Sequence, residues 1–65
     1  MMNFNAVCRV VRLAAFWRNE DEHSVLCEFL AEAEMFAFAH SCSIYTAHLM
    51  VCKAWEEIIR AAEAA

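Results

Sequence analysis

The sequence contains neither glycine nor proline in its 65 residues, and thirteen residues are alanine. Glycine and proline interrupt helices most strongly, and alanine is the best helix former. Nearly every position can therefore be helical, and Asn, Asp or Ser must make each turn. We expect an all-α protein, either a three-helix bundle or a helical hairpin that completes a bundle by homodimerisation.

The chain is short enough for one domain only, spanning residues 1–65. Asn3 or Asn5 is a candidate N-cap for the first helix, and Ser43 is a candidate for the third. Asn19 is expected to cap the second helix, with Glu22 three residues later as in a capping box. The expected helices cover about residues 4–18, 20–40 and 43–64.

The second break depends on the short segment Ser41-Cys42-Ser43. If these residues turn, the chain forms three helices. If they stay helical, one very long helix results, and the hairpin needs a second copy to form a bundle. The sequence leaves both alternatives open.

Apolar residues make up 63% of the chain, compared with roughly 45–50% in typical soluble domains. A domain of this size buries only about 60% of the surface that its unfolded chain exposes. We therefore expect a partner, either a second copy in a homodimer or a larger host or cognate protein.

Charge is distributed unevenly along the chain. The first eighteen residues are basic, with Arg9, Arg12 and Arg18, and the next sixteen are strongly acidic. Contact between these segments would partly neutralise both. The net charge of −4, with only five Lys and Arg residues, argues against nucleic-acid binding.

Helical periodicity sorts the apolar residues into faces. The expected inner face of the second helix consists of Val25, Leu26, Phe29, Leu30, Ala33, Phe36, Ala37 and His40. That of the third helix consists of Ile44, Ala47, His48, Val51, Cys52, Trp55, Ile58, Ile59 and Ala62. On the second helix, Asp21, Glu28 and Glu32 lie on the side opposite its inner face, and we interpret them as a solvated face.

Several apolar residues fall outside these inner faces, and aromatic and Met side chains of this kind are enriched at protein interfaces. Phe16 lies between arginines on a first helix that is otherwise apolar nearly all round. The predicted partner-binding residues are Arg9, Arg12, Phe16, Met35, Phe38, Leu49 and Met50.

The sharpest metal signal is a His and a Cys at positions i and i+4, which occurs twice. His23 with Cys27, and His48 with Cys52, would together supply the four ligands of a tetrahedral zinc site. In one hairpin the pairs would be about 12 Å apart along the axis, so an offset dimer would be needed. Packing in the core is the competing interpretation, and it also covers His40. We predict no cofactor.

The expected location is the cytoplasm. Arginines at 9 and 12 interrupt any apolar signal segment, and the four cysteines match no disulfide framework. Residues 35–52 carry no Asp, Glu, Lys or Arg, but they include several Ser, Thr and His residues, so a membrane span is not expected. A membrane-surface helix at residues 4–18 is a further alternative.

The sequence thus predicts a small non-enzymatic protein–protein interaction module, a regulator or inhibitor that docks an apolar helical face on a larger protein. Arg9 and Arg12 would select an acidic rim, with Phe16, Met35 and Phe38 as apolar anchors. The alternative is a zinc- or thiol-binding helical protein. Arginine and alanine usage suits a bacterial or phage genome.

Overall fold

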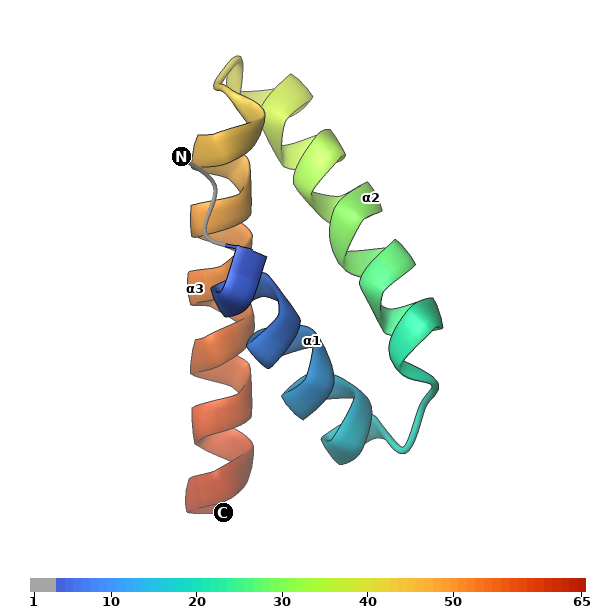
Figure 1. Cartoon of the computed structure of the whole chain (residues 1–65). Helices are drawn as coiled ribbons and strands as arrows, with labels where there is room; N and C mark the ends of the chain where they lie inside the picture. Colours follow the sequence, from blue (N-terminus) through green and yellow to red (C-terminus); the bar gives the residue numbers. More distant parts are fainter. Residues whose placement is uncertain (1–3) are drawn as a thin grey trace.

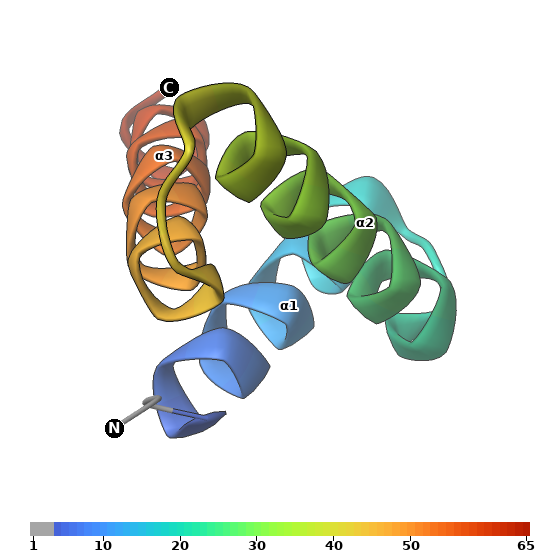
Figure 2. The same ribbon diagram turned by 90° about the horizontal axis from the view of Figure 1, so that it is seen from above.

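The computed structural model describes residues 4–65 and forms a three-helix bundle (Figure 1). Helix α1 spans Phe4–Arg18, α2 spans Glu22–His40, and α3 spans Ile44–Ala64. Each helix contacts both of the others. Seen from above, α1 packs against one side of the pair formed by α2 and α3 (Figure 2). The single long helix over the second half of the chain is thereby excluded.

Both turns replace the missing glycine with a polar residue in the left-handed conformation. Asn19 has φ 53° and Ser41 has φ 50°. After α1, the N–H groups of Asn19 and Glu20 donate to the carbonyls of Phe16 and Ala15. Two such bonds form the Schellman motif that normally uses glycine. The prediction that Asn, Asp and Ser make the turns is confirmed.

The second turn repeats this motif at the end of α2. The N–H of Ser41 donates to the carbonyl of Phe38, and the N–H of Cys42 donates to that of Ala37. Cys42 also packs against the core, which is the apolar contact that accompanies the motif. The chain direction changes by 118° between α2 and α3, so the two helices diverge from this turn.

The helix starts partly correct the sequence predictions. Ser43 caps α3 as predicted, and its hydroxyl accepts from the N–H of Thr46. The N-cap of α2 is Asp21 rather than Asn19, because Asn19 already terminates α1. Helix α2 therefore begins at residue 22 instead of 20. Asn5 lies inside α1, so it is not the cap, and Asn3 lies outside the described residues.

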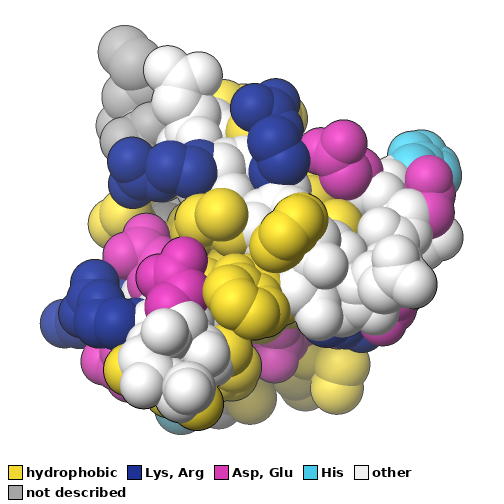
Figure 3. Space-filling model, turned by 90° about the horizontal axis from the view of Figure 1, so that it is seen from below, with side chains coloured by type: hydrophobic (Ala, Val, Ile, Leu, Met, Phe, Trp, Pro, Cys, Tyr) yellow, Lys and Arg dark blue, Asp and Glu magenta, His cyan; other side chains and the backbone are white. Residues whose placement is uncertain are grey.

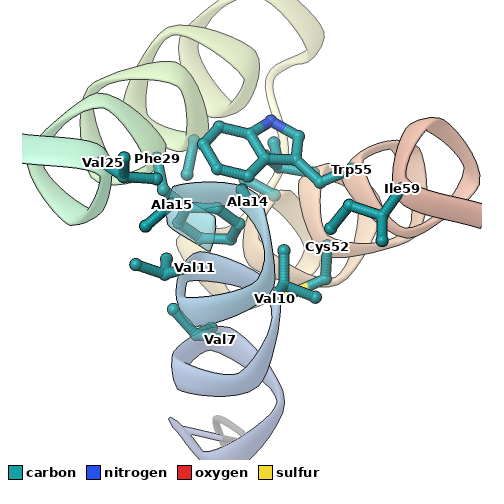
Figure 4. Packing of buried hydrophobic residues seen from close by; sticks show 13 residues of the cluster. Val7, Val10, Val11, Ala14, Ala15, Val25, Phe29, Cys52, Trp55 and Ile59 are labelled. Carbon is teal, nitrogen blue, oxygen red and sulfur yellow. The ribbon is translucent and has the colours of Figure 1, made fainter. Parts of the chain in front are cut away.

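The core lies where the three helices meet, with Phe29 at its centre (Figure 4). The Phe29 ring is fully buried and makes an edge contact with Trp55, with ring centroids 5.2 Å apart. It also lies 5.8 Å from the ring of His48, which is buried as a core histidine. Helix α1 contributes only small side chains: Val7, Val10, Val11, Ala14 and Ala15.

Some residues assigned to the inner faces are in fact exposed. His40 is exposed at the end of α2, where its ring stacks on Phe36. Leu30, Ile44 and Ile58 are 39%, 40% and 69% exposed. The divergence of α2 and α3 explains this difference, because splayed helices bury a narrower stripe than parallel ones.

Candidate functional site

A continuous set of side chains forms the outer face of α1, opposite the core. The α1 outer face consists of Arg9, Arg12, Leu13 and Phe16, which recur with helical periodicity and are all exposed. Phe16 is 75% exposed, and its ring makes an edge contact with Trp17. Seen from below, hydrophobic side chains gather at the centre of the molecule with charged side chains around them (Figure 3).

The C-terminal end of α1 is tied to α2 by ion pairs. Arg18 donates two hydrogen bonds to the Glu28 carboxylate, at 2.7 and 2.9 Å, and two more to Glu20. The bond to Glu28 is the main cause that raises the pKa of Arg18, and it lowers the pKa of Glu28. Arg12 pairs with Glu22 at 3.4 Å in an exposed position. The predicted neutralisation between the basic and acidic segments is confirmed.

A groove of about 850 Å³ lies between α2 and α3, and the last turns of α1 contribute to its lining. Small side chains leave this space open, because four of its lining residues are alanines: Ala14, Ala31, Ala39 and Ala62. We call this hollow the α2–α3 groove. Its remaining lining residues are Trp17, Arg18, Glu28, Glu32, Met35, Phe36, Trp55, Ile58 and Ile59.

One side of the α2–α3 groove is fixed by a hydrogen bond between helices. The indole N–H of the buried Trp55 donates to the carboxylate of Glu32. A buried indole N–H needs such a partner, and a charged acceptor makes the bond stronger. Asp21, Glu28 and Glu32 are exposed, as expected of a solvated face. They also have structural roles, because Glu28 binds Arg18, Glu32 accepts from Trp55 and Asp21 caps α2.

The end of the bundle at the α2–α3 turn, opposite the α1–α2 turn, exposes large apolar side chains and, within residues 35–52, no charged ones. The turn-end surface consists of five exposed large apolar residues that flank the α2–α3 turn and do not line the groove, namely Phe38, Ile44, Tyr45, Leu49 and Met50. Phe38 is 90% exposed and Leu49 is 63% exposed. Tyr45 and Leu49 are four residues apart on α3, so they share one face of that helix.

The predicted partner-binding residues are all exposed, but they occupy separate places. Arg9, Arg12 and Phe16 lie on the α1 outer face, and Met35 lines the α2–α3 groove. Phe38, Leu49 and Met50 belong to the turn-end surface.

Two of the expected anchors, Phe16 and Phe38, lie far apart. Arg18 contacts Glu28, and Phe38 lies ten residues further along α2, which is about 15 Å. Phe16, two residues before Arg18, is therefore not part of one patch with Phe38.

The two His/Cys pairs do not form one metal site. The Sγ of Cys27 lies 3.9 Å from Nε2 of His23 on the exposed start of α2, whereas His48 and Cys52 are buried in α3. Within residues 4–65, no three His, Cys, Asp or Glu side chains are arranged to hold a metal ion. Burial raises the pKa of the Cys52 thiol, and Glu56 adds to this effect.

Among the described helices, none alone has the length and apolar content to cross a membrane, although α2 and α3 meet that criterion together as a bent pair. No protein-family model, curated protein or solved structure matches the chain. The function of the chain is therefore inferred from its exposed surfaces.

Sequence reasoning missed the α2–α3 groove and most of its lining. A signal was present in α2, where Ala31, Met35 and Ala39 recur at four-residue intervals along one face. Helical periodicity places such residues on a common face, but it does not give the angle at which two helices cross. The groove depends on that angle.

Proposed function

We propose that this protein is a small non-enzymatic interaction module that docks its turn-end surface on a larger protein and acts as its regulator or inhibitor. The observation that carries the proposal is the exposure of five large apolar side chains at one end of the bundle. Large apolar side chains that are exposed together in one region of a small protein mark interaction sites. None of the five side chains carries a carboxylate, imidazole or thiol, so the surface offers contact rather than chemistry.

The shape of the turn-end surface supports docking by a helix face. Tyr45 and Leu49 share one face of α3, which is the spacing that grooves on partner proteins recognise. Phe38 projects from the neighbouring helix and is the most exposed large apolar side chain among the described residues. Aromatic side chains with this exposure become binding hot spots when a partner buries them. Phe38 is accordingly the principal anchor of the proposed interface.

The state of the cysteines supports a cytoplasmic location for this interaction. Cys8, Cys27, Cys42 and Cys52 are all free thiols. Free thiols persist in reducing compartments, whereas small secreted domains use their cysteines in disulfides. A bacterial or phage origin remains a prediction from composition.

The proposal is tested with a double variant of the turn-end surface. Tagged wild-type protein and the variant carrying Phe38→Ser and Leu49→Ser are expressed in the source cell, and bound proteins are identified by mass spectrometry. The matched control carries Phe4→Ser and Leu30→Ser, which also removes one exposed Phe and one exposed Leu. Circular dichroism checks that both variants remain helical.

We expect one stoichiometric protein partner with the wild type and the control, and its loss with the turn-end variant. Equal recovery of the partner with both variants would refute the assignment of this surface. A parallel flotation assay uses vesicles of neutral and anionic phospholipids. Binding of the wild type to vesicles, lost in the turn-end variant, in the absence of a protein partner would replace the proposal with a membrane-surface role.

A further inference from the structure

We propose that the α2–α3 groove binds the α1 outer face of a second copy of this chain, and that the two copies exchange these contacts in a symmetric dimer. This inference goes beyond the proposed function, because it uses two surfaces that the turn-end surface does not include. It assigns an occupant to the groove and a role to Arg9, Leu13 and Phe16.

The sizes of the side chains on the two surfaces are complementary. Along α2, the groove wall presents Ala31 and Ala39 on either side of Met35. Alanine leaves a shallow hole on a helix surface, and a large side chain from another helix fills such a hole. The α1 outer face supplies Leu13 and Phe16, three residues apart, as the side chains that fill these holes.

The α1 outer face is short enough to lie within the α2–α3 groove. The groove wall on α2 extends over twelve residues, from Glu28 to Ala39, and its ends are about 16 Å apart along the helix axis. The α1 outer face extends from Arg9 to Phe16, which is about 10 Å. Two turns of α1 therefore fit within the groove without meeting the α2–α3 turn.

Charge complementarity favours this occupant over an anionic ligand. The wall on α2 contains two carboxylates, Glu28 and Glu32, and its one basic neighbour, Arg18, is already paired with Glu28 and Glu20. A fatty-acid carboxylate would meet net negative charge at this rim. The α1 outer face carries arginines, and among the described residues Arg9 makes no salt bridge. Its guanidinium is available to the Glu32 carboxylate of a second copy, which makes no salt bridge within the described residues of its own chain.

The position of α1 in the fold explains why two copies would close on each other. Ala14, Trp17 and Arg18 of α1 line the groove, while Leu13 and Phe16 of the same turns face outward. The binding face and the groove are therefore adjacent on one chain. Adjacent complementary surfaces allow two copies to pair about a two-fold axis, so that both contacts form at once.

Several groove side chains that are exposed in the single chain would become buried in such a dimer. Trp17, Met35 and Ile58 line the groove and are 47%, 73% and 69% exposed. Aromatic and Met side chains are enriched at protein interfaces, and a few buried residues contribute most of the binding energy there. These three side chains lie around the position that Phe16 of the second copy would take.

Two pairs of matched variants test the dimer by sedimentation velocity and native mass spectrometry on the purified chain. Phe16→Ser removes the proposed anchor, and Phe4→Ser removes another exposed phenylalanine of the same helix. Ala62→Arg fills the groove, whereas Ala61→Arg places the same side chain beside it on α3. All four positions are exposed, so the variants are expected to fold, and circular dichroism verifies this.

We expect a wild-type dimer at micromolar concentration. Phe16→Ser and Ala62→Arg each raise the dimer dissociation constant by at least about thirtyfold, as the loss of a hot-spot residue does. The two control variants remain dimeric like the wild type. A wild-type chain that stays monomeric at 100-fold higher, roughly submillimolar, concentration would overturn the inference. Equal weakening by Phe4→Ser and Phe16→Ser would do the same.

Mixing the two defective variants tests which surface meets which. The Phe16→Ser chain keeps an open groove, and the Ala62→Arg chain keeps an intact α1 outer face, so one of the two contacts can form between them. We expect a heterodimer of these chains and no homodimer of either. Failure of the mixture to associate would refute the pairing of α1 with the groove.

This test is independent of the turn-end surface. The variant with Phe38→Ser and Leu49→Ser leaves both the groove and the α1 outer face unchanged. A dimer without a protein partner would contradict only the proposed function, and a partner-bound monomer would contradict only the dimer.

Discussion

At the α1–α2 end of the bundle, Arg12 and Arg18 are ion-paired with carboxylates of the same chain, whereas residues 35–52 around the α2–α3 turn carry no Lys, Arg, Asp or Glu. The first end satisfies its polar groups internally. The second exposes apolar side chains that nothing in the described chain covers. The comparison separates residues that hold the fold together from residues that are available to another protein.

The strongest test of this distinction uses two phenylalanines of α2. Phe29→Ala removes a fully buried ring at the centre of the core, and such a change costs about 3–5 kcal/mol. A 65-residue domain has about 3–10 kcal/mol of stability in total, so we expect this variant to be largely unfolded. Phe38→Ala removes a ring that is 90% exposed, and we expect almost no change in unfolding free energy. Urea denaturation measures both.

The groove side of the molecule is tested through its hydrogen bond between helices. Glu32→Ala leaves the indole N–H of Trp55 without its acceptor, and we expect a loss of about 1–2 kcal/mol in unfolding free energy. Glu34→Ala on the same helix is the control, with an expected change within about 0.5 kcal/mol. A similar loss in both variants, measured by thermal denaturation, would show that helix propensity rather than the bond to Trp55 is responsible.

We expect glycine at position 41 to stabilise the protein, because glycine is the residue that the Schellman motif at the α2–α3 turn prefers. Ser41 adopts a left-handed conformation that costs an L-residue about 1–2 kcal/mol, and glycine avoids this cost. After the greater entropy of unfolded glycine is subtracted, Ser41→Gly should gain about 0.5–1 kcal/mol, or about 3–6 °C in Tm. Asn19→Gly at the charged end should gain less, because asparagine tolerates this conformation better. A larger gain at Asn19 would contradict this ranking.

The smallest expected effect is the pH dependence of the charged end. Arg18 lowers the pKa of Glu28 below its ordinary value in the folded state. A lowered carboxyl pKa contributes stability above the unfolded-state value of about 4.3, and this contribution is lost as pH falls through the folded-state pKa. The Tm difference between wild type and Glu28→Gln should therefore be constant from about pH 7 to 5 and should shrink below about pH 4. A difference that grows on acidification would contradict this assignment.

The helices were predictable from sequence because their signals are local. The missing glycine and proline, the cap at Ser43 and the inner-face residues Phe29 and Trp55 each act within a few residues of chain. The start of α2 was misplaced because Asn19 suits a helix end as well as a helix start, and Asp21 competes for the second role.

The candidate site was less predictable because it depends on how helices are placed relative to each other. The exposure of Met35, Phe38 and Leu49 followed from periodicity within each helix. Periodicity did not reveal that Glu32 reaches Trp55, or that α2 and α3 diverge enough to leave a groove between them. Those features require the crossing angle of two helices, which is set by packing across the whole core.

The turn at residues 41–43 acts as the pivot of a lever. Helix α2 has 19 residues and is about 28 Å long, so a change of about 10° at this turn would move its far end by about 5 Å. That displacement is comparable to the diameter of a side chain. Glu32, which bonds Trp55 across the groove, lies nine residues before Ser41, so the same change would move it by about 2 Å. The turn therefore contributes to the width of the groove, together with the packing of the core, although none of its residues lines the groove.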